Sequence, residues 1–354
     1  MSPFELALEL TPRARLDVID VRARAAELSG HAFDGYARCL YASRHTTAGF
    51  LPQNLAARLT SRPEAIGPYL DVVRTVFPEG AGYLHDQLEL RRELAPEQVE
   101  VEPANADSHL AFIGGGLHAC VSYDARRPGP VYFVDLDGTH KGVPRRRVAT
   151  VVGYNNEIEV ARRTVRVPVS THPIDAINLK DPALGIYEML GEMIARQGIQ
   201  KGRVHIALGA GEQFASLTIN EYETLLMQHD LAEVLHNPLR FAAEKAKHAW
   251  NDPRALPAKA RGYVKYDLVR ALNRLVDALG LRASRIERLV ARTLEVPASR
   301  FMRMRRSVDL LVSDSAQNGA SAVIEGPYQT PILVQWRPPA HAVRTVEISL
   351  TQFS

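Results

Sequence analysis

Residues 41–50 read YASRHTTAGF, and this segment contains both the end of a predicted strand and the first candidate site residue. Alternating apolar and polar side chains favour a strand that ends at Ser43, so Tyr36–Ser43 is predicted as a strand. His45 follows this strand directly and is itself followed by Thr46 and Thr47. The end of a strand is a position from which side chains commonly reach a ligand, so a site is expected here.

Two further segments place histidines in polar surroundings. His85 lies in Tyr83-Leu84-His85-Asp86, and His109 lies in a predicted helix over Asn105–Ile113. A catalytic zinc takes three protein ligands and keeps a fourth position open, so His45, His85 and His109 are candidate ligands of a divalent metal, namely zinc. None of the three pairs at i, i+4, so the fold would have to gather them. Three hydrogen-bonded structural histidines are the alternative.

The neighbours of these histidines offer further chemistry. Asp86 is expected either to accept a hydrogen bond from a ligand imidazole or to act as a general base. Hydroxyl and guanidinium groups of the kind that hold phosphate or carboxylate oxygens occur at Arg44, Thr46, Thr47 and Ser108. Taken singly, Thr46, Thr47 and Ser108 are more often residues of caps or turns.

The order of the motifs resembles that of the YjbQ-like family, known as secondary thiamine-phosphate synthases. Residues 45–48 (HTTA), 83–86 (YLHD) and 108–110 (SHL) match the family's H-T-[ST]-A, Y-x-H-D and [AS]-H-[IL] patterns. The match extends over residues 4–147. Two parts differ, because the family's L-N-E-N is replaced at residues 52–55 and its G-T-W-Q-G is reduced to Gly129-Pro130.

This resemblance implies a metal-dependent transferase that joins a pyrimidine diphosphate to a thiazole phosphate with loss of pyrophosphate. The implied catalytic residues are His45, His85, His109 and Asp86, and the implied substrate is small and anionic. The resemblance also implies a homo-oligomer such as a trimer. A metal-dependent hydrolase or isomerase of a small anionic molecule stays open, and so does a non-catalytic binding protein.

The second half of the chain repeats the pattern of the first. Gly202 precedes Glu212 by ten residues, as Gly35 precedes His45, and the residues that follow align without gaps. The family's L-T-[IL]-N-E occurs at residues 217–221, and Gly326-Pro327-Tyr328-Gln329 resembles its G-T-W-Q. The predicted domains are therefore 1–155, with the three histidines, and 156–354, a degenerate copy. The second copy is expected to be structural, and a composite site is the alternative.

The predicted fold class is α/β of the α+β type, with two tandem domains that each contain a mostly antiparallel sheet packed by helices. Pro12 is expected to join the strands Phe4–Leu10 and Leu16–Val21 as a hairpin. Helical periodicity predicts helices over Val21–Leu28, Ile66–Val76 and Leu184–Gln197.

An insertion over residues 238–306 has no counterpart in the first half. It contains 17 Lys and Arg against 6 Asp and Glu, which gives it a net charge of +11 in a chain of net charge +3. Apolar stripes predict helices over Val264–Leu279 and Ile286–Leu294. Such a basic segment could bind a polyanion, but no groove-reading or aromatic motif accompanies it, so docking on the acidic remainder or a solvated helix face is favoured over nucleic acid.

Composition bounds the class of protein. The chain has 354 residues, of which 46% are hydrophobic, and no apolar run approaches the length of a membrane span. Charges interrupt the apolar residues at the start, so a signal peptide is not expected. Cys39 and Cys120 lie in apolar segments and are expected to be buried and reduced. These features predict a globular cytoplasmic protein without a membrane partner.

Overall fold

The structure is a computed structural model, and it describes residues 1–60, 66–88, 96–100, 102–171, 175–221, 305–315, 320–335 and 337–354. The chain divides into two compact units. The first unit comprises residues 1–53, 117–222 and 304–354, and the second comprises residues 54–116 and 223–303. The helices predicted over 264–279 and 286–294 lie outside the described residues.

The first half of the chain gives the first unit two antiparallel sheets, with the strand orders β1-β9-β3-β5 and β2-β6-β4. The bounds are β1 (Phe4–Leu10), β2 (Asp17–Asp20), β3 (Arg38–Ser43), β4 (Ala48–Phe50), β5 (Cys120–Asp124), β6 (Tyr132–Asp135) and β9 (Arg147–Tyr154). Alternation along β1 buries Leu8 and Leu10 on one face, as a half-buried strand requires. A short pair, β7 (Thr139–His140) and β8 (Val143–Pro144), stands apart from both sheets.

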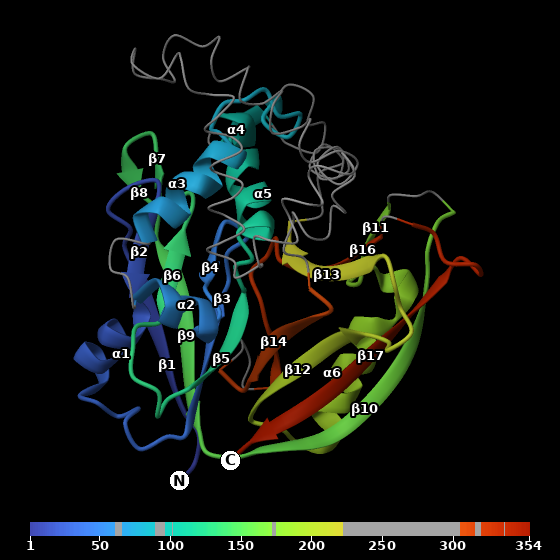
Figure 1. Ribbon diagram of the computed structural model, residues 1–354. Helices are drawn as coiled ribbons and strands as arrows, with labels where there is room; N and C mark the ends of the chain where they lie inside the picture. The colour runs from blue at the N-terminus through green and yellow to red at the C-terminus, as the bar shows by residue number, and fades with distance from the viewer. Residues whose placement is uncertain are drawn as a thin grey trace, which may run out of the picture. The chain divides into compact units, whose positions relative to one another are not determined.

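The second half gives the same unit two more antiparallel sheets, with the orders β10-β17-β12-β14-β15 and β11-β16-β13. The bounds are β10 (Glu157–Pro168), β11 (Asp175–Asn178), β12 (Lys201–Leu208), β13 (Ala215–Asn220), β14 (Ser307–Ser313), β15 (Ala322–Ile324), β16 (Thr330–Gln335) and β17 (Val343–Phe353). Figure 1 shows the long pair of β10, in green, and β17, in red. Both sets of sheets thus follow one order, and β15 is an addition at the edge.

A shared core joins the two larger sheets of the first unit. It contains Leu40, Ala42, Cys120, Val152 and Tyr154 from the first half, with Leu311 and Phe353 from the second. The rings of Tyr154 and Phe353 stack with centroids 3.9 Å apart and planes 3° apart. The two halves therefore bury apolar surface against each other.

The first unit contains the α1 helix from the first half of the chain and the α6 helix from the second half. The α1 helix (Val21–Ser29) begins at Asp20, whose side chain accepts from two backbone N–H groups, and ends at Gly30 in the left-handed region. The α6 helix (Ile186–Gln197) follows the short 3₁₀ helix η3 (Pro182–Leu184). Its residues Ile186, Leu190, Met193 and Ile194 are buried, at the spacing of one helix face.

The described part of the second unit is helical. Its elements are α2 (Gln53–Thr60), which begins one residue before the unit does, α3 (Ile66–Val76), α4 (Pro96–Val99) and α5 (Ala106–Gly114). Every residue of α5 is buried. The α3 and α5 helices pack together, and the Tyr69 hydroxyl of α3 donates to the Gly115 carbonyl at 2.6 Å, just beyond α5. This hydrogen bond satisfies one of the carbonyl groups that have no partner within the helix at its C-terminal end.

The predicted fold class is confirmed, because the described sheets are antiparallel and few helices accompany them. The predicted hairpin is wrong. β1 pairs with β9 and β2 pairs with β6, so the two strands belong to different sheets. The backbone and side chain of Arg13, between the strands, donate hydrogen bonds to Asp17, the first residue of β2, so the chain turns without pairing the strands.

The predicted boundary at 155/156 falls in the turn between β9 and β10, inside the first unit, and stays a prediction.

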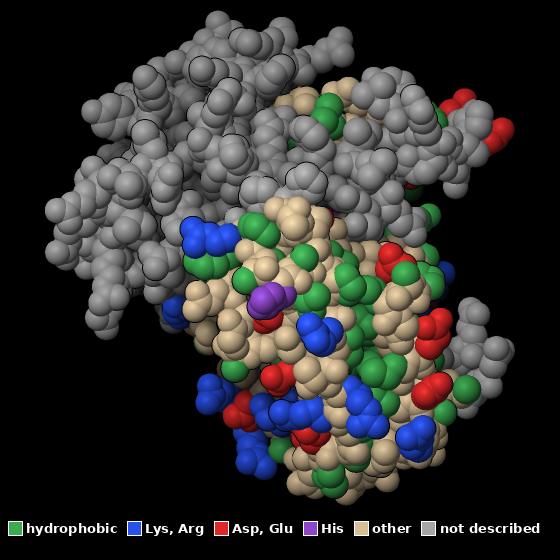
Figure 2. Space-filling view, turned by 90° about the vertical axis from the view of Figure 1, so that its right-hand side faces the viewer, with side chains coloured by type: hydrophobic (Ala, Val, Ile, Leu, Met, Phe, Trp, Pro, Cys, Tyr) green, Lys and Arg blue, Asp and Glu red, His purple; other side chains and the backbone are tan. Residues whose placement is uncertain are grey.

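No helix among the described residues is long and apolar enough to cross a membrane. Figure 2 shows one face of the molecule, on which the described basic and acidic side chains are interspersed.

Candidate functional site

The loop that carries His45 joins β3 to β4 and is closed by Ser43. The Ser43 hydroxyl accepts from the backbone N–H of His45 at 3.2 Å and donates to the carbonyl of Ala48 at 2.8 Å. Ser43 is the last residue of β3 and Ala48 the first of β4, so one buried hydroxyl fixes both ends of the loop.

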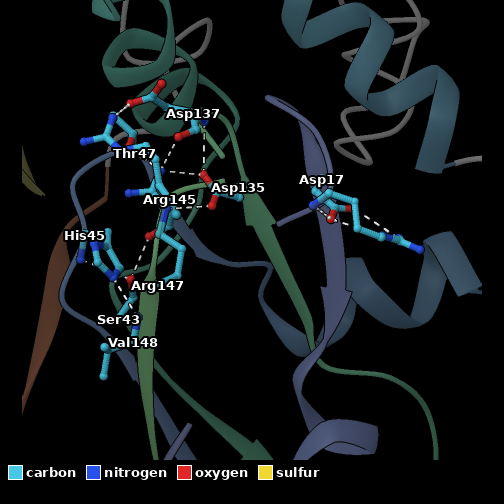
Figure 3. Close-up of polar contacts among 11 residues, drawn as sticks. Asp17, Ser43, His45, Thr47, Asp135, Asp137, Arg145, Arg147 and Val148 are labelled. Atoms are coloured by element: carbon cyan, nitrogen blue, oxygen red, sulfur yellow. Dashed lines mark hydrogen bonds and ion pairs between the residues drawn. The ribbon is translucent and has the colours of Figure 1, made fainter. Parts of the chain in front are cut away.

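The ring of His45 is tied to β9 (Figure 3). Its Nε2 accepts from the backbone N–H of Val148 at 2.8 Å, so in the neutral ring the proton lies on Nδ1. Burial lowers the pKa of His45 to about 3, and the positive charges of Arg147, Arg145 and Arg44 act in the same direction. A metal bond through either nitrogen would require this arrangement to change. His45 as a third metal ligand therefore stays a prediction.

A buried ion pair lies beside this loop. Arg147, only 3% exposed, donates from Nε and Nη2 to the two carboxylate oxygens of Asp135 at 2.7 and 2.8 Å. Its Nη2 also reaches the Asp137 carbonyl and the Thr47 hydroxyl, the latter at 3.4 Å. Burial raises the pKa of Asp135, although Arg147 opposes the shift. Arg145 pairs with the Asp137 carboxylate.

Sequence reasoning missed this network, although it assigned Thr47 to substrate binding. The basic run 145–147 and the acidic residues 135 and 137 were visible, but no spacing rule states which arginine is buried. The structure places Thr47 against Arg147, so its hydroxyl supports the loop.

Arg44 differs from the other two arginines near His45. It makes no hydrogen bond or ion pair with any described residue, and its Nε is buried. Thr46 lies next in the same loop and is half-buried. An unpaired guanidinium in a fixed loop is chemically suited to hold an anionic group.

In the second unit the structure brings His85, Asp86 and His109 together. His85 and His109 are fully or almost fully buried, and their ring centroids lie 5.2 Å apart. His85 Nδ1 lies 3.1 Å from Asp86 Oδ1. The same carboxylate oxygen accepts from the backbone N–H of Ala106 at 2.9 Å, which fixes Asp86 at the start of α5.

This arrangement fits a metal ligand pair. A carboxylate that accepts from Nδ1–H leaves Nε2 as the unprotonated nitrogen of His85, which is the usual state of a metal-binding imidazole. One ring nitrogen of His85 lies within 4.8 Å of one of His109. Two zinc–nitrogen bonds of about 2.0–2.1 Å at a tetrahedral angle place their nitrogens about 3.4 Å apart, so the two rings would move toward each other on binding one ion.

Ser108 and Asp107, the neighbours of His109, are buried in the first turn of α5. The Ser108 hydroxyl lies 3.4 Å from an Asp107 carboxylate oxygen, at the long limit of a hydrogen bond. The structure thus places Ser108 within the unit that holds His85 and His109, while Arg44, Thr46 and Thr47 lie in the first unit.

The second half contains a counterpart of the His45 network. Arg344, 2% exposed, donates from Nε to the Gln335 side-chain carbonyl at 3.0 Å and from Nη1 to Glu212 at 2.8 Å. The backbone N–H of Thr345 donates to the other Glu212 oxygen at 2.6 Å. Glu212 therefore binds the residue after a buried arginine, as the first-half histidine binds the residue after Arg147.

No protein-family model and no curated protein matches the chain. Among solved structures it is similar to a YbjQ-like protein of unknown function from Sulfolobus solfataricus, with 14% identity and a TM-score of 0.29 over 56% of this chain and 99% of the other. It is also similar to an uncharacterized protein of the YjbQ/UPF0047 family from Clostridium acetobutylicum, with 13% identity and a TM-score of 0.26 over 54% and 99%. A conserved hypothetical protein from Thermus thermophilus gives 16% identity and 0.25 over 53% and 98%.

Proposed function

We propose that the protein is a metal-dependent enzyme that acts on a small anionic substrate, and that His85 and His109 hold a divalent metal, zinc. The main support for this proposal is the contact of His85 Nδ1 with Asp86 Oδ1 at 3.1 Å beside the ring of His109. When bound, the metal would supply positive charge to a leaving phosphate or lower the pKa of a bound water. Asp86 holds the His85 tautomer and is itself held by α5.

The charge distribution in the first unit supports an anionic substrate. Arg147 and Arg145 have carboxylate partners, whereas Arg44 has none among the described residues. A phosphate or carboxylate would form an ion pair with the Arg44 guanidinium, and the Thr46 hydroxyl could donate a further hydrogen bond to it. The family resemblance makes the transfer between a pyrimidine diphosphate and a thiazole phosphate the first reaction to test.

We also propose that the two halves are tandem copies of one YjbQ-like domain. The sheets of both halves have the same strand order, and a buried arginine at the start of β9 and near the start of β17 makes matching contacts in each. His45 and Glu212 accept from the backbone N–H that follows the arginine in each half. The two halves differ at this position, because the second half has Glu212 where the first has His45, one of the three predicted metal ligands.

Zinc titration followed by calorimetry tests the metal proposal. We expect one tight zinc ion on the wild type and a large loss of affinity in His85→Ala and His109→Ala. Asp86→Asn should weaken zinc binding by about 10–100-fold, because the imidazole loses its anionic partner. His205→Ala is the matched control, since His205 also contacts an aspartate through Nδ1, at 2.8 Å from Asp309.

An assay of pyrophosphate release from a pyrimidine diphosphate and a thiazole phosphate tests the reaction. Product formation that depends on His85 and His109 supports the transferase. Zinc binding without this product, but with turnover of a small phosphate or carboxylate ester, supports a hydrolase. Equal zinc affinity in the wild type, His85→Ala and His109→Ala contradicts the metal site.

A further inference from the structure

The loop of residues 326–329 contacts the backbone of the His45 loop directly, although the two lie far apart in the sequence. A Cβ atom built on Gly326 would lie 1.9 Å from the Arg44 carbonyl oxygen, so no other residue type fits there. Gln329 is buried, with 3% exposure. Both loops belong to the first unit.

Gln329 uses its whole amide group in this contact. Its Nε2 donates to the carbonyls of Ser43 and His45, each at 2.9 Å, and its Oε1 accepts from the Gly326 N–H at 3.0 Å. Both carbonyls lie in the loop that carries Arg44. The side chain therefore ties three backbone groups together, and a carboxylate at this position could not donate to either carbonyl.

The contact is one-sided. The position in the first half that corresponds to residues 326–329 is reduced to Gly129-Pro130, which has no glutamine. The Glu212 loop is held instead by its own half, because Arg306 donates to the carbonyls of Glu212 and Gly209 at 2.7 Å each. The first half therefore has the histidine motifs, and the second half has the Gly326–Gln329 motif that the first lacks.

We infer that Gln329 and Gly326 are positioning residues of the His45 loop, so that the second half of the chain shapes the loop that carries Arg44, His45 and Thr46. The loop then belongs to a composite site of both halves, and the second copy is more than a scaffold. This inference rests on the proposed function only for the role of the loop toward an anion. The positioning itself stands on the contacts of Gln329.

Amide hydrogen exchange of residues 43–48 in the full chain, with NMR detection, tests this. In Gln329→Ala we expect these amides to exchange about tenfold faster or more, the effect of losing at least one net hydrogen bond. The ring ¹⁵N signals of His45 should also shift, because a mobile loop weakens the bond from Val148 to Nε2. Gln329→Glu, nearly the same shape, should give both effects.

Gln335→Ala is the matched control. Gln335 is also a buried glutamine of the second half, but its amide contacts Arg344 and the Ser170 carbonyl. This variant should leave the His45 signals and the exchange of residues 43–48 unchanged. Equal effects of Gln329→Ala and Gln335→Ala, or no effect of Gln329→Ala, would overturn the inference. So would global unfolding of both Gln329 variants while Gln335→Ala stays folded.

Two ligand measurements separate this inference from the proposed function. Inorganic phosphate is titrated while the amide signals of Arg44 and Thr46 are followed. Phosphate binding that weakens in Gln329→Ala but not in Gln335→Ala supports the role of the loop toward an anion, and equal binding overturns that role. Zinc affinity measured on the same variants reports on His85 and His109 alone. Absent zinc binding with a loosened loop contradicts the proposed metal site and leaves the positioning established.

Discussion

At the residue scale, comparison of the two halves shows that an imidazole and a carboxylate accept the same backbone hydrogen bond. His45 and Glu212 each accept from a backbone N–H that follows a buried arginine, at 2.8 and 2.6 Å. Burial lowers the pKa of His45 most, and the positive charges of Arg147, Arg145 and Arg44 lower it further. A negative side chain at this position would therefore find favourable charges.

We predict that His45→Glu retains most of the stability that His45→Ala loses. Alanine leaves the buried N–H of Val148 without its acceptor, which costs about 1–3 kcal/mol. Glutamate restores an acceptor, and nearby guanidinium groups stabilise its charge. Urea unfolding of the three proteins measures the difference, and equal midpoints for the two variants would contradict the shared role of His45 and Glu212.

A second prediction at this scale concerns Gly326. Gly326→Ala should reduce the free energy of unfolding by about 1–3 kcal/mol or more, because its methyl group overlaps the Arg44 carbonyl. Gly211→Ala is the control, since its added methyl group meets nothing within 4 Å and alanine restricts the unfolded chain. Thermal unfolding of both variants should show a loss for the first and no loss for the second.

At the element scale, a charged cluster ties β1 to the sheet of the second half. Glu5 on β1 pairs with Lys201 on β12 and accepts from the Ser313 hydroxyl at 2.6 Å. Burial acts to raise the pKa of Glu5, but the hydrogen bonds from Lys201, Ser313 and Ser315 lower it overall. The pKa of Lys201 is raised, since Asp314 and Glu5 outweigh the opposing effect of burial.

These shifts give stability a definite pH dependence. A carboxyl group with a lowered pKa stabilises the folded state above its unfolded pKa and loses this effect as the pH falls through the folded pKa. The wild type should therefore lose more stability between pH 6 and pH 3 than Glu5→Gln does. Glu9→Gln is the control on the same strand, because the Glu9–Arg146 pair is exposed and contributes little. Parallel pH profiles for wild type and Glu5→Gln would contradict the prediction.

At the scale of the whole first unit, the shared core predicts that its two halves unfold as one cooperative structure. Phe353 lies at the end of β17 and stacks on Tyr154 of β9 with centroids 3.9 Å apart. Phe353→Ala should cost about 3–5 kcal/mol, the usual loss for removing a buried aromatic ring. Hydrogen exchange should then increase in β3 and β12 together. Phe4→Ala, at a residue 36% exposed, is the control, and an increase confined to β12 would contradict cooperative coupling.

Local patterns predicted most elements of the fold, because a strand such as Phe4–Leu10 and a helix such as Ile66–Val76 express their own periodicity. Strand pairing was less accessible. The partner of β1 is β9, more than a hundred residues later, and nothing in the turn at Pro12 indicates it. The His85–Asp86 contact followed from adjacency. The Arg147–Asp135 pair and the Gln329 contacts depend on tertiary packing, which spacing does not encode.

The pairing of β10 with β17 also sets the order of events during synthesis. Glu157 pairs with Phe353, so β10 leaves the ribosome long before its only partner among the described strands exists. At about 5–20 residues per second, the wait between the ends of the two strands lasts roughly 10–40 s. Over that interval the nascent chain presents an unpaired strand edge to solvent or to chaperones. Fast-elongating expression hosts should therefore yield more soluble protein than slow ones.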